Sequence, residues 1–261
     1  MAKGPKKHLK RINAPKSWLM DKMGGNFAVR PSQGPHALRQ SIPIQVFLRD
    51  RIKVALNGRE ANMILHQKQG LVYIDKKVRR DPKYPIGLMD VVEIPEMNGA
   101  WRCMYDVKGR FTFVRLAKTE TSHKLCRIMK KQMGPNRIAY IVTHDARTIR
   151  FADPSISVND TIRYDIEKGQ VEAVLKFETG NTAYVSEGNN KGRVGVITHI
   201  TKLDGSHDII TLRDKNNHTF TTRVEFVFVI GKGEESSISL PRHAGVAVSV
   251  LEEARMRASS E

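Results

Sequence analysis

The chain has 261 residues, which is long enough for two or three small domains that each bury a core. Its 44 lysines and arginines outnumber its 27 aspartates and glutamates and give a formal net charge of +17. This excess predicts a polyanionic partner, nucleic acid before an anionic membrane surface. No apolar run approaches the length of about 18 residues that a membrane span needs, and the N-terminus is too basic for a signal peptide. We therefore expect a protein of the cytosol or nucleus.

The cysteines and histidines give no sign of a metal centre. Cys103 and Cys126 lie far apart in the sequence and form no CxxC pair, so we expect two buried, reduced thiols. The nine histidines are scattered, without an HxH, HxxxH or Cys–His cluster. The sequence thus predicts no metal site, no cofactor and no small-molecule substrate.

Residues 1–41 are predicted to form a basic N-terminal arm, in which Asp21 is the single acid. Prolines and glycines interrupt any long helix, so we expect an extended arm that has little core of its own and becomes ordered only against another surface. Trp18 and Phe27 are more apolar than a free tail requires, which indicates docking on the protein or stacking on bases. The simpler alternative is a disordered basic tail that raises solubility.

Residues 42–104 are predicted to form two helices on a small sheet. The first helix places apolar residues on one side, and Asn57-Gly58 is expected to end it. The second helix is expected to run up to Gly70. The apolar positions are Ile44, Phe47, Leu48, Ile52, Ala55 and Leu56 in the first helix and Ala61, Ile64 and Leu65 in the second.

After Gly70 the apolar period changes from 3.6 to 2, with Val72 and Ile74 facing inward. A tight turn is expected at residues 75–77, and a later strand at residues 91–94. The outer side of this module is mostly cationic, which suits the phosphate backbone of folded RNA. The runs QGLVYIDKKV and DPKYPIGLMDVVEI, after two short helices, resemble the S-four type RNA-binding module. That resemblance implies that the second helix and the following strand lie against structured RNA.

Residues 105–175 are predicted to form a β-rich central domain that holds its neighbours at a fixed spacing. We expect strands at 110–116, 138–143, 147–151, 160–166 and 171–177. Ser122 is expected to begin a helix that ends at Gly134-Pro135 and carries Leu125 and Ile128 inward. On that helix, Lys124, Arg127, Lys130 and Lys131 would face outward.

Residues 176–232 are predicted to form a five-stranded barrel, and residues 233–261 a tail with a short helix. The segment GNTAYVSEGNNKGRVGVI resembles the KOW motif, a small SH3-like barrel that binds RNA in many translation proteins. Gly192 lies between Lys191 and Arg193 and would place two cations at a loop tip. A glycine that serves only the turn is an equally open interpretation.

The whole order of segments resembles the eukaryotic and archaeal small-subunit ribosomal protein family numbered four, e-type. The resemblance includes HDARTIRF and DPSISVNDTIRYDI in the middle and FVFVIGKG before SISLPR. It implies an α+β multi-domain constituent of the small (40S-type) ribosomal subunit that binds small-subunit ribosomal RNA and neighbouring ribosomal proteins. Such a protein would support subunit assembly and translation in the cytoplasm after nucleolar passage. It would not be an enzyme.

Two other classes of protein, an enzyme and a transcription or translation factor, are alternatives. A pseudouridine synthase would need a large catalytic domain with a positioned aspartate, whereas small β units follow the module here. A nucleotide or S-adenosylmethionine enzyme would need a glycine-rich phosphate loop, and neither Gly188–Gly195 nor Gly231–Gly233 has its spacing. A transcription or translation factor that uses the barrel to dock proteins stays open.

The residues predicted to contact RNA are cations of the arm, the module and the KOW-like loop, together with one histidine and one glycine. His66 could equally be an ordinary exposed side chain. The full set is Lys6, Lys7, Lys10, Arg11, Arg49, Lys53, Arg59, His66, Lys68, Lys76, Lys77, Arg79, Arg80, Lys191, Gly192 and Arg193.

Overall fold

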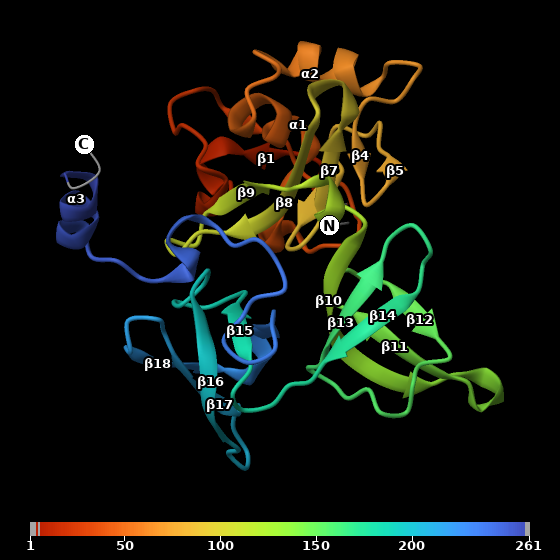
Figure 1. The fold of residues 1–261 in the computed structure, drawn as a ribbon. Helices are drawn as coiled ribbons and strands as arrows, with labels where there is room; N and C mark the ends of the chain where they lie inside the picture. The colour runs from red at the N-terminus through yellow and green to blue at the C-terminus, as the bar shows by residue number, and fades with distance from the viewer. Residues whose placement is uncertain (1–3, 5, 259–261) are drawn as a thin grey trace. The chain divides into compact units, whose positions relative to one another are not determined.

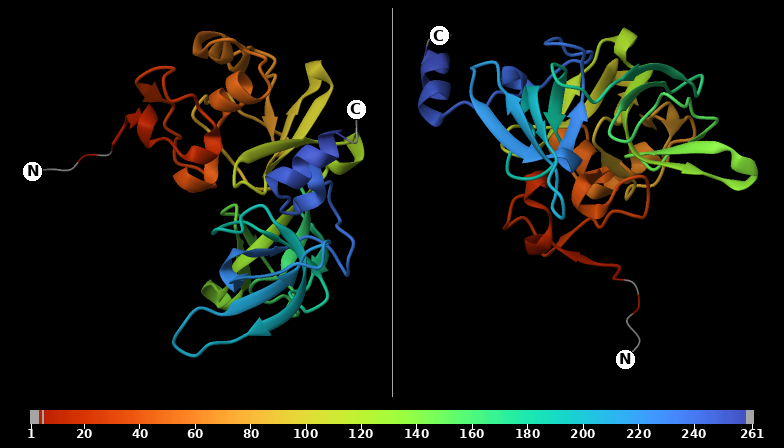
Figure 2. Two further views of the ribbon diagram at one scale, coloured as in Figure 1. Left: turned by 90° about the vertical axis from the view of Figure 1, so that its left-hand side faces the viewer. Right: turned by 90° about the horizontal axis from the view of Figure 1, so that it is seen from below.

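The computed structural model describes residue 4 and residues 6–258, and these residues divide into two compact units (Figures 1 and 2). Unit 1 combines the chain up to residue 104 with residues 110–174, and unit 2 combines residues 105–109 with the chain from residue 175 onward. Both helices and several antiparallel sheets are present, in agreement with the predicted mixture of α and β structure. The finer division into five segments stays a prediction.

The N-terminal arm has local structure and is part of unit 1. β1 (Leu9–Lys10) pairs with β2 (Phe27–Ala28). Trp18 is completely buried, and its Nε1 donates a hydrogen bond to the carbonyl oxygen of Ser41 at 2.7 Å. The carbonyl oxygen of Ser17 accepts a hydrogen bond from Nη2 of Arg51 at 3.3 Å, which confirms the expectation that the arm docks on the protein. Phe27, by contrast, remains 53% exposed.

The first predicted helix is much shorter than expected. β3 (Ser41–Pro43) leads into α1 (Ile44–Val46), and one π-helical turn follows at Phe47–Arg51. Lys53 then takes a left-handed conformation with φ of 61°, which a right-handed helix cannot continue. The prediction of a helix extending to Leu56 is therefore wrong, and the Leu56 side chain is 85% exposed.

Asn57 begins the second helix instead of ending the first. Its side chain accepts a hydrogen bond from the backbone N–H of Glu60 at 2.9 Å, and the Glu60 carboxylate accepts one from the N–H of Leu56 at 2.7 Å. This reciprocal cap starts α2 (Gly58–Leu65). Ala61 and Leu65 are buried, as their spacing predicted, but the helix ends at Leu65, before Gly70.

A five-stranded sheet, in the order β5-β4-β7-β8-β9, accompanies these helices. Its strands are β4 (Tyr73–Ile74), β5 (Lys77–Val78), β7 (Val91–Ile94), β8 (Gly99–Tyr105) and β9 (Phe111–Arg115), and β6 (Pro85–Gly87) pairs with β3. Asp75 and Lys76 have φ of 49° and 60°, which matches the tight turn predicted there. Val72 and Ile74 are buried as predicted.

The second sheet of unit 1, in the order β12-β11-β10-β13-β14, corrects the largest error of the sequence analysis. Residues 123–133 form its long central strand, not a helix. The strands are β10 (His123–Met133), β11 (Ala139–Thr143), β12 (Thr148–Arg150), β13 (Thr161–Asp165) and β14 (Val171–Leu175). The first six residues of β10 are all buried, because β10 is covered on both faces. Lys124 and Arg127, which were expected to face outward, are therefore buried, whereas Lys130 and Lys131 are exposed.

Unit 2 contains a sheet of five strands, in the order β18-β17-β16-β15-β19. They are β15 (Thr182–Val185), β16 (Val194–Thr201), β17 (Ile209–Arg213), β18 (Thr219–Arg223) and β19 (Val227–Val229). The number of strands is as predicted, but β18 and β19 are its edges, so the pairing is open and does not close a barrel. The predicted C-terminal helix is present as α3 (Val250–Ala258), with Val250 and Leu251 more than 70% exposed.

Short 3-10 turns connect many of these elements. They lie at Arg11–Asn13, Lys16–Trp18, Leu38–Gln40, Pro95–Met97, Lys118–Glu120, Pro135–Arg137, Val224–Phe226 and Arg242–Gly245. Within the described part of the chain, no helix has both the length and the apolar character that crossing a bilayer would require.

Gly192 occupies a tight place inside unit 2. Its φ is +87°, and a Cβ added there would lie 2.1 Å from the carbonyl oxygen of Asp106. The neighbouring cations are also engaged within the unit. The Lys191 ammonium lies 3.4 Å from the centroid of the Tyr105 ring, and Arg193 forms an ion pair with Asp214 at 3.5 Å. These contacts support the interpretation that the glycine serves the local structure.

We predict that Gly192→Ala destabilises unit 2 clearly more than Gly205→Ala. Gly205 also has a positive φ, of +74°, but nothing lies within 4 Å of an added Cβ. Gly205→Ala should therefore lower the free energy of unfolding only by the conformational cost of about 1 kcal/mol. Gly192→Ala must in addition displace the backbone at Asp106. Urea denaturation of both full-length variants measures the difference, and equal losses would contradict the tight approach.

Candidate nucleic-acid interface

Four basic side chains of the predicted set are exposed on helix α2, in the turn after it and after strand β5. Arg59, His66, Lys68 and Arg80 are all exposed, and we call this group the α2 surface. The Lys68 carbonyl accepts a hydrogen bond from Nη2 of Arg80 at 3.3 Å, which brings these two residues together. Since Ala61 and Leu65 take up the buried side of the helix, the α2 surface faces solvent. This is the arrangement that contact with phosphates requires.

Three other predicted cations of the module already have partners in the protein. Lys76 pairs with Glu93 at 3.0 Å and with Glu167 at 3.4 Å. Burial alone would lower the pKa of Lys76, but the hydrogen bond with Glu93 raises it overall. Arg49 pairs with Asp50 at 2.9 Å, and the Arg79 guanidinium lies 4.5 Å from the centroid of the Tyr84 ring. A phosphate would have to compete with these partners.

The basic residues of the arm are divided in the same way. Lys10 lies 4.2 Å from the centroid of the Phe27 ring, and Nε of Arg11 donates to the carbonyl oxygen of Asp21. Lys6 and Lys7, by contrast, line an open groove of about 610 Å³. Lys53 and Lys77, in the module, are exposed.

The groove beside the arm contains two cations that the sequence analysis did not select. Arg30 and Lys83 line it together with Lys6 and Lys7, and none of its lining residues is acidic. The Ser32 N–H donates to the carbonyl oxygen of Lys83 at 2.8 Å, which joins the end of the arm to the module. Arg30 and Lys83 are far apart in sequence, so only this pairing reveals their proximity. The groove suits an anionic ligand such as a phosphate.

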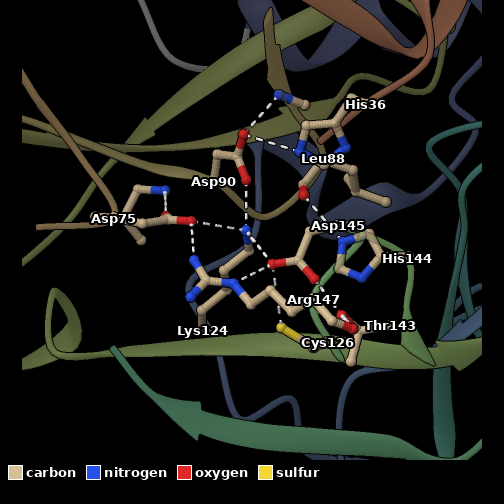
Figure 3. A network of polar contacts seen from close by, with 12 residues as sticks. His36, Asp75, Leu88, Asp90, Lys124, Cys126, Thr143, His144, Asp145 and Arg147 are labelled. Atoms are coloured by element: carbon tan, nitrogen blue, oxygen red, sulfur yellow. Dashed lines mark hydrogen bonds and ion pairs between the residues drawn. The ribbon is translucent and has the colours of Figure 1, made fainter. Parts of the chain in front are cut away.

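Behind these surfaces, a buried ionic network joins the two sheets of unit 1 (Figure 3). The ammonium of Lys124, on β10, is completely buried and contacts three carboxylates. Its Nζ lies 3.0 Å from Oδ2 of Asp75 and 3.0 Å from Oδ2 of Asp145, and it also donates to Oδ1 of Asp90. The three acids come from the β4–β5 turn, the residue before β7 and the β11–β12 turn.

Further hydrogen bonds complete the network. Arg147 donates from Nη2 to Asp75 and from Nε to Asp145, both at 2.6 Å. Nε2 of His36 lies 2.9 Å from Oδ2 of Asp90. The same Oδ2 accepts a hydrogen bond from the backbone N–H of Gly87 at 2.8 Å. Each buried carboxylate therefore has several donors, which is the condition for keeping a buried charge.

The network holds Lys124, Asp90 and Asp145 in their charged forms. Burial would lower the pKa of Lys124, but Asp75, Asp90 and Asp145 raise it well above its usual value. Burial would likewise raise the pKa of Asp90, but His36 and Lys124 lower it below its usual value. The pKa of Asp145 is also lowered, because Lys124 outweighs the effect of burial.

Cys126, His144 and Asp145 lie close enough together to resemble metal ligands, with potential ligand atoms within 4.8 Å of one another. Their contacts indicate a different role. Nδ1 of His144 accepts the N–H of Arg127 at 3.2 Å, so its Nε2–H donates to the carbonyl of Leu88 at 3.2 Å. Burial raises the pKa of the Cys126 thiol, and Lys124 already neutralises Asp145. The cluster is part of the hydrogen-bonded network. Cys103 and Cys126 are both buried and are not joined in a disulfide, as predicted.

Comparison with known proteins identifies the family. The model described as Ribosomal family S4e matches residues 97–171, the RS4NT (NUC023) domain matches residues 3–39, and the 40S ribosomal protein S4 C-terminus matches residues 214–261. The small ribosomal subunit protein eS4 of Tetrahymena thermophila is 50% identical over 99% of this chain and 100% of its own length. The eS4 protein of Ixodes scapularis is 51% identical, with 100% of both chains covered.

A solved structure extends this agreement to the fold. The crystal structure of the 30S ribosomal protein S4e from Thermoplasma acidophilum aligns with a TM-score of 0.65 and 30% identity, over 76% of this chain and 99% of that one. Similarity over the whole length defines a structural protein of the ribosome, not an enzyme. The chain belongs to the eS4 family of small ribosomal subunit proteins. The resemblance found in the sequence is thereby confirmed.

We predict that Lys124→Met lowers the free energy of unfolding by about 3 to 5 kcal/mol, because it leaves buried carboxylates without their cation. Urea denaturation at neutral pH measures this loss. Lys130→Met, an exposed position on the same strand, is the matched control and should change stability by less than about 0.5 kcal/mol. Similar stabilities for the two variants would show that the network contributes little.

Stability should also fall on acidification. Burial lowers the pKa of His144 to about 4, so below about pH 6.5 the unfolded chain takes up a proton that the folded chain does not. The stability due to neutral His144 is therefore lost as the pH falls from about 6.5 to about 4. Asp90 and Asp145, whose pKa values are lowered, add a further loss below about pH 4.

We expect His144 to account for about 2 kcal/mol of lost stability between about pH 7 and about pH 4.5. Urea midpoints across this range measure the change. His144→Gln cannot titrate, so its profile should be flatter even if its stability at pH 7 is lower. A residual slope is expected from His123, because burial lowers the pKa of that histidine too. An unchanged slope in the variant would contradict the assignment.

Proposed function

We propose that the protein binds small-subunit ribosomal RNA through unit 1. Its main contacts would be the α2 surface and the groove lined by Lys6, Lys7, Arg30 and Lys83. The observation that carries this proposal is the exposed group of Arg59, His66, Lys68 and Arg80 beside a helix whose apolar side is buried. Phosphate contacts of this kind release condensed counterions and supply much of the affinity for RNA. Binding would anchor the protein in the small subunit and support assembly and translation.

Several finer assignments belong to this proposal. We infer that α1 and α2 act as an S-four type RNA-binding module, and that the strands of unit 2 serve as a KOW-like, SH3-like element. The internal contacts of Lys191 and Arg193 favour a supporting role for their loop over a direct phosphate contact.

The position in the cell and the protein partners follow from the family. A small-subunit ribosomal protein works on ribosomes in the cytoplasm, and we infer passage through the nucleolus during assembly. We also propose that neighbouring ribosomal proteins cover α3, whose Val250 and Leu251 are 77% and 73% exposed. These two neighbouring aliphatic side chains would offer a protein partner apolar area to bury.

We predict that replacing Arg59, His66 and Lys68 together with alanine weakens binding to small-subunit ribosomal RNA with little change in stability. All three side chains are exposed, so the melting temperature should hardly move. Removal of the two permanent charges should reduce the slope of log affinity against log salt by about 1.5. Filter binding at several salt concentrations measures both effects.

The control for this experiment removes two other exposed cations of unit 1, Arg115 and Lys118, which lie outside the proposed surface. Their replacement should change affinity and salt slope less. If the triple variant binds ribosomal RNA as tightly as the parent protein, the α2 surface is not the RNA contact.

A high-salt wash of small subunits tests the alternative class. A translation factor would leave the subunits during the wash, whereas an integral constituent sediments with them.

A further inference from the structure

The hairpin of β10 and β11 extends beyond the core of unit 1. Residues 129–133 at the end of β10 are all exposed, whereas residues 123–128 of the same strand are buried. Pairing with β11 continues to Met133, and the N–H of Gly134 donates a hydrogen bond to the carbonyl of Ile138 at 2.9 Å. Figure 1 shows that this end of the hairpin projects beyond the rest of the sheet. An ordered hairpin that buries little apolar surface is not explained by core packing, which is a reason to look for a partner.

The register of the strands determines which side chains share a face of the hairpin. Side chains of directly paired residues lie on the same face of a sheet, and neighbours along a strand alternate between faces. Gln132 pairs with Tyr140, and Tyr140 pairs on its other side with Arg150, so these three residues form one row. Lys130 pairs with Val142, two positions along each strand from that row, and lies on the same face. We call Lys130, Gln132, Tyr140 and Arg150 the outer hairpin face.

The opposite face of the hairpin is turned to the protein. Ile141 is completely buried there, in the core cluster of this sheet. Lys131 pairs with Ile141, and its Nζ donates to the carbonyl oxygens of Pro154 and Ile156, both at 2.8 Å. The outer hairpin face is therefore the one that a partner can reach.

The charges on and beside the outer hairpin face are positive. Lys130, Arg150 and Arg137, which lies in the connecting turn, are exposed, and none of them forms an ion pair within the described part of the chain. No acid occurs between residues 128 and 144 or between residues 146 and 152. Asp145, the acid between these segments, already lies 3.0 Å from the ammonium of Lys124. A cationic face of this kind complements a polyanion.

Two uncharged polar groups on the same face narrow the choice of polyanion. The Tyr140 hydroxyl donates a hydrogen bond to Oε1 of Gln132 at 2.7 Å. This bond leaves the amide N–H donors of Gln132 and the lone pairs of the Tyr140 oxygen for a ligand. A ribose 2′-hydroxyl is both a donor and an acceptor, so it can bind both groups at once. The minor groove of double-stranded RNA is wide and shallow and displays these hydroxyls beside the phosphates.

We infer that the outer hairpin face binds the minor groove of double-stranded RNA. Gln132 and Tyr140 would contact a 2′-hydroxyl, and Lys130 and Arg150 the phosphates on either side. The inference rests on the proposed function and adds a second RNA contact, separate from the α2 surface.

The first experiment tests the phosphate contacts. Replacing Lys130 and Arg150 together with glutamine should reduce the slope of log affinity against log salt for small-subunit ribosomal RNA by about 1.5, because two phosphate contacts are lost. Both side chains are exposed, so the melting temperature should hardly move. The control, Arg115→Gln with Lys118→Gln, removes the same charge from another exposed part of unit 1 and should change the slope less.

The second experiment tests the 2′-hydroxyl contact with an RNA duplex of about 16 base pairs. The protein carries alanine at Arg59, His66 and Lys68, so that the α2 surface contributes little. A 2′-O-methylated duplex retains its phosphates but cannot donate from the 2′ oxygen, and it should bind about fivefold more weakly than the unmodified duplex.

The tyrosine hydroxyl is then removed in the same background. Tyr140→Phe removes the acceptor of the 2′-hydroxyl proton, so the difference between the two duplexes should shrink to less than about twofold. Tyr164→Phe is the matched control, because Tyr164 packs against the core cluster of the same sheet. This control should keep the full difference.

The outcomes distinguish the inference from the proposed function. If the parent protein does not bind ribosomal RNA, the proposed function fails. If the parent binds but the glutamine variant keeps its salt slope, or Tyr140→Phe discriminates between the duplexes as before, only the inference about the hairpin is overturned. If the glutamine variant binds RNA like the parent but no longer enters small subunits, the face docks a neighbouring protein, and the inference is again overturned.

Discussion

The structure of unit 1 depends on a lysine that is charged and yet completely buried. The Lys124 ammonium can remain in the interior only because Asp75, Asp90 and Asp145 surround it. These carboxylates in turn would repel one another without the cation. Because these acids come from segments of both sheets, the charge of Lys124 also holds the sheets together. Asp75 lies in the β4–β5 turn next to Lys76 and Lys77, so the network also fixes this turn.

The sequence predicted elements whose signals are local. The tight turn at Asp75 and Lys76 and the buried side of α2 were found, because a few neighbouring residues determine each of them. Strand β10 was missed because the spacing of Leu125, Ile128 and Met129 fits a helix, and a strand covered on both faces shows no alternation. Lys124 lies within an apolar run, and a helical period predicts that its side chain faces outward. Only its distant partners show that it points inward.

The existence of an RNA-binding surface was predictable from the sequence, but its exact residues were not. Composition and the family resemblance indicated an RNA-binding surface, but they could not show which cations are available to RNA. Lys76 is paired with Glu93 and Glu167, and Arg193 with Asp214, and each of these partners lies well away in the sequence. Arg30 and Lys83 were missed on the same account, since only the fold brings them to one groove.

The basic residues thus fall into two groups. Buried cations hold the fold together, and exposed cations are available to bind RNA. Lys124 and Arg102 are buried, and Arg102 donates from Nη2 to the carbonyls of Glu120 and His123 at 3.1 and 3.2 Å. Such contacts are weakly screened by salt and persist whether or not RNA is present. The cations of the α2 surface are exposed, so they repel one another in the free protein, and added salt or bound RNA relieves this repulsion. Salt should therefore stabilise the free protein while it weakens the complex, because the charges that bind RNA are not the ones that hold the fold.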